Sequence, residues 1–289
     1  MKIYSWLAAI LFTAQSAFAE PSVTPLKIAV SIPPQEYIAR EIGGDLVEIM
    51  TLVDAGQSPA TYEITPKQMA ALSGADLYFK IGVPFEKNLA KKIENSLPDL
   101  PVIDCAPDVA LSSEHETGGH GHNHGSEDSH VWLDPLRIPK IARIMMNELV
   151  VHRPSQREYF QANYNALEER VALITNEITE MLETHRGKTF YVFHPAFGSF
   201  AKRFGLHQDA IEQDGKEPGG KYLAGLIERM KKEKVKHIYV QPQFSKKSAR
   251  AIADEIGAEL IELDPLARDI VTNLKSIAVK IVKGFESQQ

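Results

Sequence analysis

The stretch from Gln156 to His185 restricts the fold most strongly, because it contains neither glycine nor proline. An apolar stripe runs through it at spacings of three to five residues, formed by Tyr159, Tyr164, Leu167, Val171, Ile174, Ile178 and Leu182. This period predicts one amphipathic helix. About 30 residues at 1.5 Å each give a helix roughly 45 Å long, which exceeds what most globular folds use. Since the stretch lies near the middle of the chain, we predict two lobes joined by one long backbone helix.

Short β-branched segments alternate with helical segments on both sides of that helix. The expected strands are 26–32, 47–53, 75–81 and 102–104 before it, and 189–193, 237–240 and 260–263 after it. The expected helices are 36–42, one opened by Thr65 and Pro66, 84–97, 135–151, 197–204, 222–234, 246–256 and one from about 268. Such alternation predicts parallel sheets covered by helices, so each lobe should be α/β.

These patterns divide the chain into four parts. We predict a signal peptide over 1–19, an N-terminal α/β lobe over 20–153, a linking helix over 154–186 and a C-terminal α/β lobe over 187–289. The N-terminal lobe includes a histidine-rich loop over 112–129.

The first residues have the pattern of a secretory signal. Lys2 gives a positive start, an apolar run from Trp6 to Phe12 follows, and Ala17-Phe18-Ala19 is a small-x-small site that predicts cleavage after Ala19. No cysteine lies near this site, so we expect no lipid anchor. Cys105 is the single cysteine and can form no intramolecular disulfide, so we expect the fold to be stable without one. A formal net charge of −6 gives no electrostatic case for nucleic acid. We therefore expect a periplasmic, unanchored protein, monomeric by default.

The segment from Ser112 to Ser129 has no apolar periodicity and is rich in histidine. Its histidines, interleaved with glycine, are His115, His120, His122 and His124. Imidazole suits zinc, copper and nickel, so we interpret the segment as an auxiliary metal-binding loop of modest affinity. A solvated linker without function is the alternative.

Three further residues are candidate metal ligands. His194 follows the expected strand 189–193, Asp264 follows 260–263, and His130 follows the histidine-rich loop directly. The carboxyl ends of parallel strands present ligand-binding groups in α/β sheets. Each residue alone is more often an ordinary hydrogen-bonded side chain. Together they form a set of two histidines and one carboxylate, which suits Zn²⁺, Fe²⁺ or Mn²⁺ in a cleft between the lobes.

From Leu26 to the C-terminus the chain resembles the solute-binding proteins of zinc and manganese ABC transporters, the ZnuA-like and TroA-like family. The matching segments, in order, are AVSIPPQEYIAREIGGD, YEITP, DSHVWLDP, FHPAFGSFAKRFGL, EPGG, QPQFSKKSARAIADEIGAEL and LDPL. The resemblance implies two α/β lobes joined by a long helix, with a metal between the lobes. It places His130, His194 and Asp264 on metal-ligand positions, and a histidine-rich loop is typical of the zinc-type members.

The chain departs from the family pattern at its first ligand position. The family motif reads Pro-His-x-Tyr-Glu, whereas Ala60 stands here in place of the histidine. Three protein ligands and a water could hold the ion, a loop histidine could replace the missing ligand, or tight binding or the metal preference could have changed. Glu63 is a further candidate ligand from the same segment. Gln241, where many relatives have glutamate, is not expected to bind the metal.

The resemblance implies that the protein captures Zn²⁺ and delivers it to an inner-membrane ABC permease. Because zinc ligands must be deprotonated, we expect affinity to fall as the imidazoles protonate. Alternatives are a manganese or iron carrier, a periplasmic zinc buffer and, less favoured, a zinc hydrolase. The chain has no HExxH pair and no G-x-S-x-G turn, so we predict that it is not an enzyme.

Overall fold

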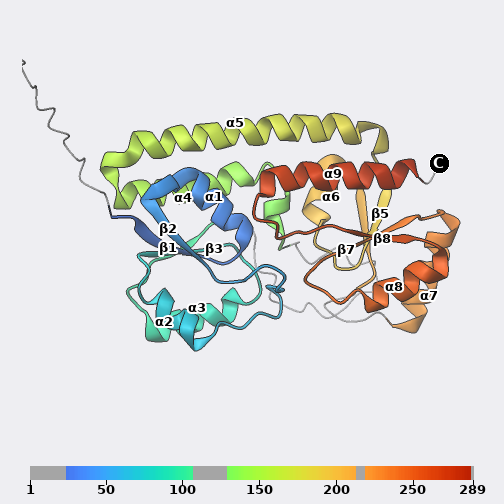
Figure 1. Ribbon diagram of the computed structural model, residues 1–289, viewed down its shortest axis with the longest axis horizontal. Coiled ribbons are helices and arrows are strands. Elements are labelled where there is room, and N and C mark those ends of the chain that lie inside the picture. Colours follow the sequence, from blue (N-terminus) through green and yellow to red (C-terminus); the bar gives the residue numbers. More distant parts are fainter. Residues whose placement is uncertain (1–23, 107–128, 213–218, 288–289) are drawn as a thin grey trace, which may run out of the picture.

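The computed structural model describes residues 24–106, 129–212 and 219–287. Within these ranges the chain forms two four-stranded parallel sheets, one before and one after a long helix in the sequence, and both lie on the same side of that helix (Figure 1). The predicted α/β fold of two lobes and a connecting helix is therefore confirmed. The division of the chain into four parts at 19, 153 and 186 stays a prediction.

The N-terminal lobe is built around a sheet of order β2-β1-β3-β4. Its strands are β1 (Leu26–Val30), β2 (Val47–Thr51), β3 (Leu77–Lys80) and β4 (Val102–Asp104). Its helices are α1 (Pro33–Gly43), α2 (Pro66–Leu72), α3 (Glu86–Ser96) and α4 (Ile138–His152), with 3₁₀ turns η1 (Gly44–Leu46) and η2 (Val131–Leu133). Thr65 and Gln68 form a reciprocal capping box at the start of α2, which confirms the predicted opening of this helix.

The C-terminal lobe repeats the plan with a sheet of order β6-β5-β7-β8. Its strands are β5 (Thr189–Val192), β6 (His207–Ala210), β7 (His237–Val240) and β8 (Glu259–Glu262). Its helices are α6 (Gly198–Phe204), α7 (Gly220–Lys232), α8 (Lys247–Ile256) and α9 (Ile270–Glu286). Strand β6 was not predicted. Its sequence, His-Gln-Asp-Ala, has no β-branched residue, and β6 is an edge strand that pairs with β5 alone.

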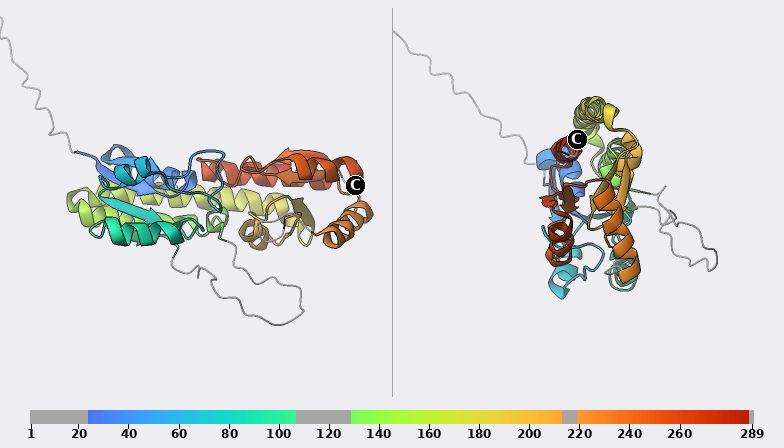
Figure 2. Two further views of the ribbon diagram at one scale, coloured as in Figure 1. Left: turned by 90° about the horizontal axis from the view of Figure 1, so that it is seen from below. Right: turned by 90° about the vertical axis from the view of Figure 1, so that its right-hand side faces the viewer.

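The long helix α5 (Arg157–Leu182) lies along both lobes (Figures 1 and 2). The 3₁₀ turns η3 (Pro154–Gln156) and η4 (Glu183–His185) extend it at either end. Helices α1 and α4 lie between α5 and the first sheet, and α9 lies beside α5 over the second. Apolar side chains from both lobes, including Ile28, Leu167, Phe197 and Ile277, belong to one continuous core.

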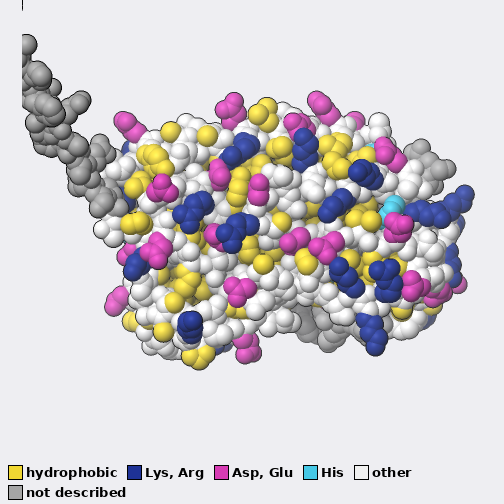
Figure 3. Space-filling view, in the orientation of Figure 1, with side chains coloured by type: hydrophobic (Ala, Val, Ile, Leu, Met, Phe, Trp, Pro, Cys, Tyr) yellow, Lys and Arg dark blue, Asp and Glu magenta, His cyan; other side chains and the backbone are white. Residues whose placement is uncertain are grey.

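The surface of the protein carries charges of both signs. Acidic and basic side chains are interspersed over the face drawn in Figure 3. Among the described helices, none combines the length and apolar character needed to cross a membrane.

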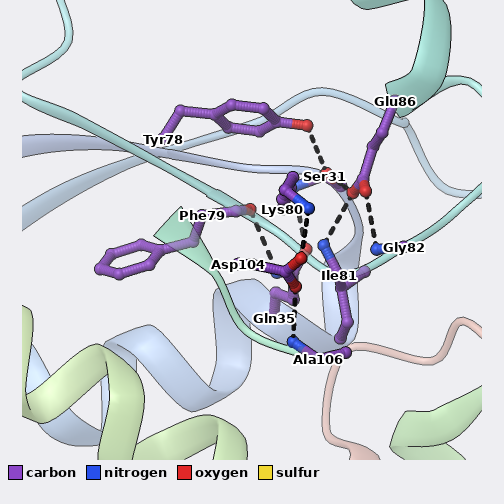
Figure 4. A network of polar contacts seen from close by, with 10 residues as sticks. All are labelled: Ser31, Gln35, Tyr78, Phe79, Lys80, Ile81, Gly82, Glu86, Asp104 and Ala106. Atoms are coloured by element: carbon purple, nitrogen blue, oxygen red, sulfur yellow. Dashed lines mark hydrogen bonds and ion pairs between the residues drawn. The ribbon is translucent and has the colours of Figure 1, made fainter. Parts of the chain in front are cut away.

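A buried carboxylate fixes the turn after β3 (Figure 4). Glu86 is 3% exposed and accepts hydrogen bonds from the backbone N–H groups of Ile81 (2.9 Å) and Gly82 (2.7 Å) and from the Ser31 hydroxyl. Burial raises the pKa of Glu86, and the three donors partly offset this effect. The Ser31 hydroxyl also lies 2.7 Å from that of Tyr78, so the carboxyl ends of β1 and β3 are held together.

Cys105 is buried beside this network, and burial raises the pKa of its thiol well above the ordinary value. A buried thiol of raised pKa is typical of a small core residue rather than of a reactive cysteine.

Candidate metal centre

Two histidines from different lobes meet where the lobes face each other. His130 immediately precedes η2 in the N-terminal lobe, and His194 follows β5 in the C-terminal lobe. Their ring centroids are 5.4 Å apart, and the ring planes make an angle of 76°. The sequence predicted this pair, and the fold brings the two imidazoles close enough to bind one ion between them.

His194 is held on several sides by its own lobe. Its Nδ1 lies 2.9 Å from Oε2 of Glu212, a carboxylate that is 7% exposed. In a neutral imidazole, the tautomer that donates from Nδ1 to this carboxylate leaves the lone pair of Nε2 available to a metal. The ring stacks on Phe244 at 4.4 Å, and the backbone N–H of His194 donates to Oε1 of the fully buried Gln241 (2.9 Å).

Sequence reasoning did not single out Glu212. This residue lies two positions after β6, the edge strand that was also not predicted. The backbone N–H of Glu212 donates to the carbonyl oxygen of Phe193, which sets it beside His194. No sequence pattern identified this contact, because it depends on the pairing of β6 with β5.

His130 is supported by an aromatic neighbour that bridges the lobes. The rings of His130 and Trp132 are in edge contact, with centroids 5.3 Å apart. Trp132 is 1% exposed, and its Nε1–H donates to the carbonyl oxygen of Pro265 at 2.7 Å. The segment after His130 is therefore fixed to the segment that carries Asp264.

Asp264 follows β8, as predicted, and its carboxylate is already hydrogen-bonded. Oδ1 accepts from Nε2 of Gln243 (2.7 Å) and from the backbone N–H of Leu266 (2.9 Å). Within 24–106, 129–212 and 219–287, no three His, Cys, Asp or Glu side chains are grouped so that they could hold a metal ion. The structure thus brings His130 and His194 together, whereas a ligand role for Asp264 stays a prediction.

Ala60 and Glu63 lie in the loop between β2 and α2, and both are exposed. Glu63 lines a pocket of about 690 Å³ whose walls come entirely from residues 54–71 of the N-terminal lobe. Figure 1 shows this loop reaching toward the other lobe. Glu63 is not grouped with the histidine pair, and its contact with a metal stays a prediction. The loop histidines His115, His120, His122 and His124 lie outside the described residues.

A family profile matches nearly the whole of this arrangement. The family described as zinc-uptake complex component A, periplasmic (ZnuA), matches residues 28–283. The chain belongs to this family. The resemblance inferred from the sequence segments is thereby confirmed.

The chain is also similar to individual proteins and to a solved structure. The chain is 27% identical to the high-affinity zinc uptake system protein ZnuA of Yersinia pestis, over 94% of this chain and 93% of that protein. It is 29% identical to the zinc-binding lipoprotein AdcA of Streptococcus pneumoniae serotype 4, over 83% of this chain but 50% of AdcA, so it spans about half of that relative. A crystal structure of ZnuA superposes with a TM-score of 0.80 at 36% identity, over 90% of this chain and 99% of that one.

Proposed function

We propose that this ZnuA-family protein binds Zn²⁺ between its lobes and delivers it to an ABC permease in the inner membrane. The observation that carries the proposal is the pair of imidazoles, His130 and His194, contributed by opposite lobes with centroids 5.4 Å apart. Nitrogen ligands favour zinc over manganese, which prefers oxygen. The names of the Yersinia and Streptococcus relatives, a zinc uptake protein and a zinc-binding lipoprotein, support the same ion.

The proposed ligands are His130, His194 and Asp264. Ala60 offers no donor atom at the first family position, so a water completes a four-coordinate shell. A histidine of the 112–129 loop is the competing fourth ligand. The arrangement with water leaves one position more weakly held than in a closed structural site, and this suits a protein that must release its cargo.

The protein is proposed to work in the periplasm as a monomer, after removal of residues 1–19. The description of the matching family as periplasmic supports the compartment. The signal peptide itself lies outside the described residues. We propose no catalytic role, and an assay of zinc-loaded protein on ester and phosphoester substrates should give no turnover above that of zinc alone.

The decisive experiment is calorimetric titration of zinc into the metal-stripped chain 20–289. His130→Ala and His194→Ala should each abolish the tight site. His207→Ala, which alters an exposed histidine of the same C-terminal lobe, should not. Tight binding that survives the loss of both His130 and His194 would contradict the proposal.

A deletion variant that lacks residues 112–129 distinguishes the two candidate fourth ligands. If one tight site survives the deletion, the loop is not needed to complete the shell. If tight binding disappears, a loop histidine is the fourth ligand or the loop is itself the binder. Reconstitution with the permease in vesicles then separates a carrier, which supports zinc uptake, from a buffer, which does not.

A further inference from the structure

Gln243 is the side-chain partner of Asp264, the candidate carboxylate ligand. It lies in the loop between β7 and α8, and its Nε2 donates to Oδ1 of Asp264 at 2.7 Å. The amide orientation follows from chemistry, because a carboxylate oxygen needs a donor and only Nε2 supplies one. The other amide atom, Oε1, is buried and has no hydrogen-bond partner among the described residues.

The two carboxylate oxygens of Asp264 differ in their hydrogen bonds. Both of its hydrogen-bond donors, Nε2 of Gln243 and the backbone N–H of Leu266, go to Oδ1. The backbone on either side is fixed as well, since the Asp264 carbonyl accepts from Nδ2 of Asn273 (2.8 Å) and the Pro265 carbonyl accepts from Trp132. The carboxylate therefore cannot turn freely, and Oδ2 is the oxygen left to approach an ion.

The same loop also holds the other C-terminal candidate ligand. Gln241 accepts from the backbone of His194, and Phe244 stacks on the His194 ring. Residues 241–244 thus position His194 and Asp264 together. A change at Gln243 that leaves Gln241 and Phe244 in place can alter Asp264 selectively.

We propose that Gln243 is a specificity-determining residue that keeps Asp264 a one-oxygen ligand and thereby favours zinc over manganese. Zinc is satisfied by four ligands in a tetrahedron. Manganese prefers more ligands, mostly oxygen, so it gains when a carboxylate binds through both oxygens. With Oδ1 occupied by two N–H donors, the second oxygen is withheld. This inference rests on the proposed function, in which Asp264 binds the transported ion.

The test compares Gln243→Leu with the wild-type chain. Leucine fills similar space and removes the donor to Oδ1. Separate titrations with zinc and with manganese should show the ratio of the manganese Kd to the zinc Kd falling about tenfold or more, on the scale seen for residues that support metal ligands. X-ray absorption of the manganese-loaded variant should show one more oxygen neighbour than in the wild-type chain.

The control is Gln161→Leu, which removes an exposed glutamine of α5 whose amide donates to the side chain of Asn165. It should leave the ratio unchanged. Gln243→Met, also without a donor, replaces the leucine variant if the latter does not fold. A purely structural role for Gln243 would weaken both metals by the same factor, and that result, or an unchanged ratio, overturns the inference.

The proposed function fails in a different way. If Asp264→Ala leaves the zinc Kd of the wild-type chain unchanged, Asp264 is not a ligand and the inference on Gln243 falls, whereas the proposed function falls only if zinc still binds tightly without His130 and His194. If Asp264→Ala weakens zinc but Gln243→Leu leaves the ratio unchanged, only the inference on Gln243 falls.

Discussion

Trp132 of the N-terminal lobe donates a 2.7 Å hydrogen bond from its indole Nε1–H to the carbonyl oxygen of Pro265 in the C-terminal lobe. The same side chain is in edge contact with the ring of His130. One buried aromatic residue therefore fixes the distance between the two segments that carry His130 and Asp264.

Replacing Trp132 by phenylalanine should weaken both the fold and the metal site. The aromatic contact to His130 can persist, but the buried Pro265 carbonyl loses its donor, which costs about 1–3 kcal/mol. We expect a lower urea midpoint and weaker zinc binding by calorimetry. Tyr222→Phe removes a similar bond, to the Ala210 carbonyl within one lobe, and should leave zinc affinity unchanged. Equal effects of the two variants on zinc would contradict a bridging role.

Glu212→Gln should reduce zinc affinity about 10–100-fold, the range found for partners of metal-binding histidines. The amide no longer supplies a negative acceptor to Nδ1 of His194, so the ring is a weaker and less well oriented ligand. The measurement is zinc competition with a chromophoric chelator. Glu233→Gln, at a carboxylate that accepts from Tyr191 in the same lobe, is the matched control and should bind zinc normally.

The ion pair between Asp134 and Arg203 also joins the lobes. The guanidinium donates to both carboxylate oxygens, at 2.7 and 2.8 Å, and Asp134 is 8% exposed. Arg203→Met should lower the free energy of unfolding by about 1–2 kcal/mol, at the low end for a charged hydrogen bond because the arginine is partly solvated. Urea unfolding of the metal-free chain measures this loss. The exposed pair of Arg229 with Asp209 gives the comparison, and Arg229→Met should cost less.

His185 should make the fold less stable in mild acid. Burial lowers the pKa of His185 below its ordinary value of 6.5; the positive charge of Lys188 adds to this effect and Glu286 opposes it. The unfolded chain then binds the proton more readily than the folded one, so stability is complete above pH 6.5 and is lost as the pH falls toward the lowered pKa. In metal-free protein, Tm should fall between pH 7.5 and pH 5.5.

The variant His185→Phe, which can keep the stacking on Phe285, should reduce that fall in Tm. His207→Phe, at an exposed histidine, serves as the control. If His207→Phe flattens the pH profile as much as His185→Phe does, the burial of His185 is not the cause.

Zinc binding should leave the overall dimensions of the molecule nearly unchanged. Helix α5 runs along both lobes and packs on α4 and α9, so bending between the lobes would break the same core on both sides. We expect the X-ray scattering profiles of metal-free and zinc-loaded protein to overlap. A marked decrease in the radius of gyration on loading would show that the helix does not prevent closure.

The sequence predicted what depends on local pattern. The stripe from Tyr159 to Leu182 identified α5, and Thr65 with Pro66 identified the start of α2. The sequence could not identify β6, because this edge strand has no alternation of apolar residues. It is defined by its backbone pairing with β5, which a local pattern does not reveal.

The supports of the candidate ligands were equally hidden from the sequence. Glu212 is 18 residues from His194, and Trp132 is 133 residues from Pro265. Glu212 acquires its role only when β6 pairs with β5, and Trp132 only when the two lobes fold against each other. His194 could be named because a histidine after a strand end carries a chemical signal, and His130 because it directly follows the histidine-rich segment, whereas nothing in the local sequence distinguishes Glu212 or Trp132.

The continuous core beneath α5 has a consequence for how such proteins can be recombined. Each lobe is formed by one continuous stretch of sequence, so a cut within the long helix would separate the chain into one fragment for each lobe. Each fragment would nevertheless carry half of a shared interior, with residues such as Leu167 and Ile277 newly exposed to water. The lobes are therefore not interchangeable modules. A chimera of two relatives should fold only if the side chains under the helix are transplanted together with the lobe that they complete.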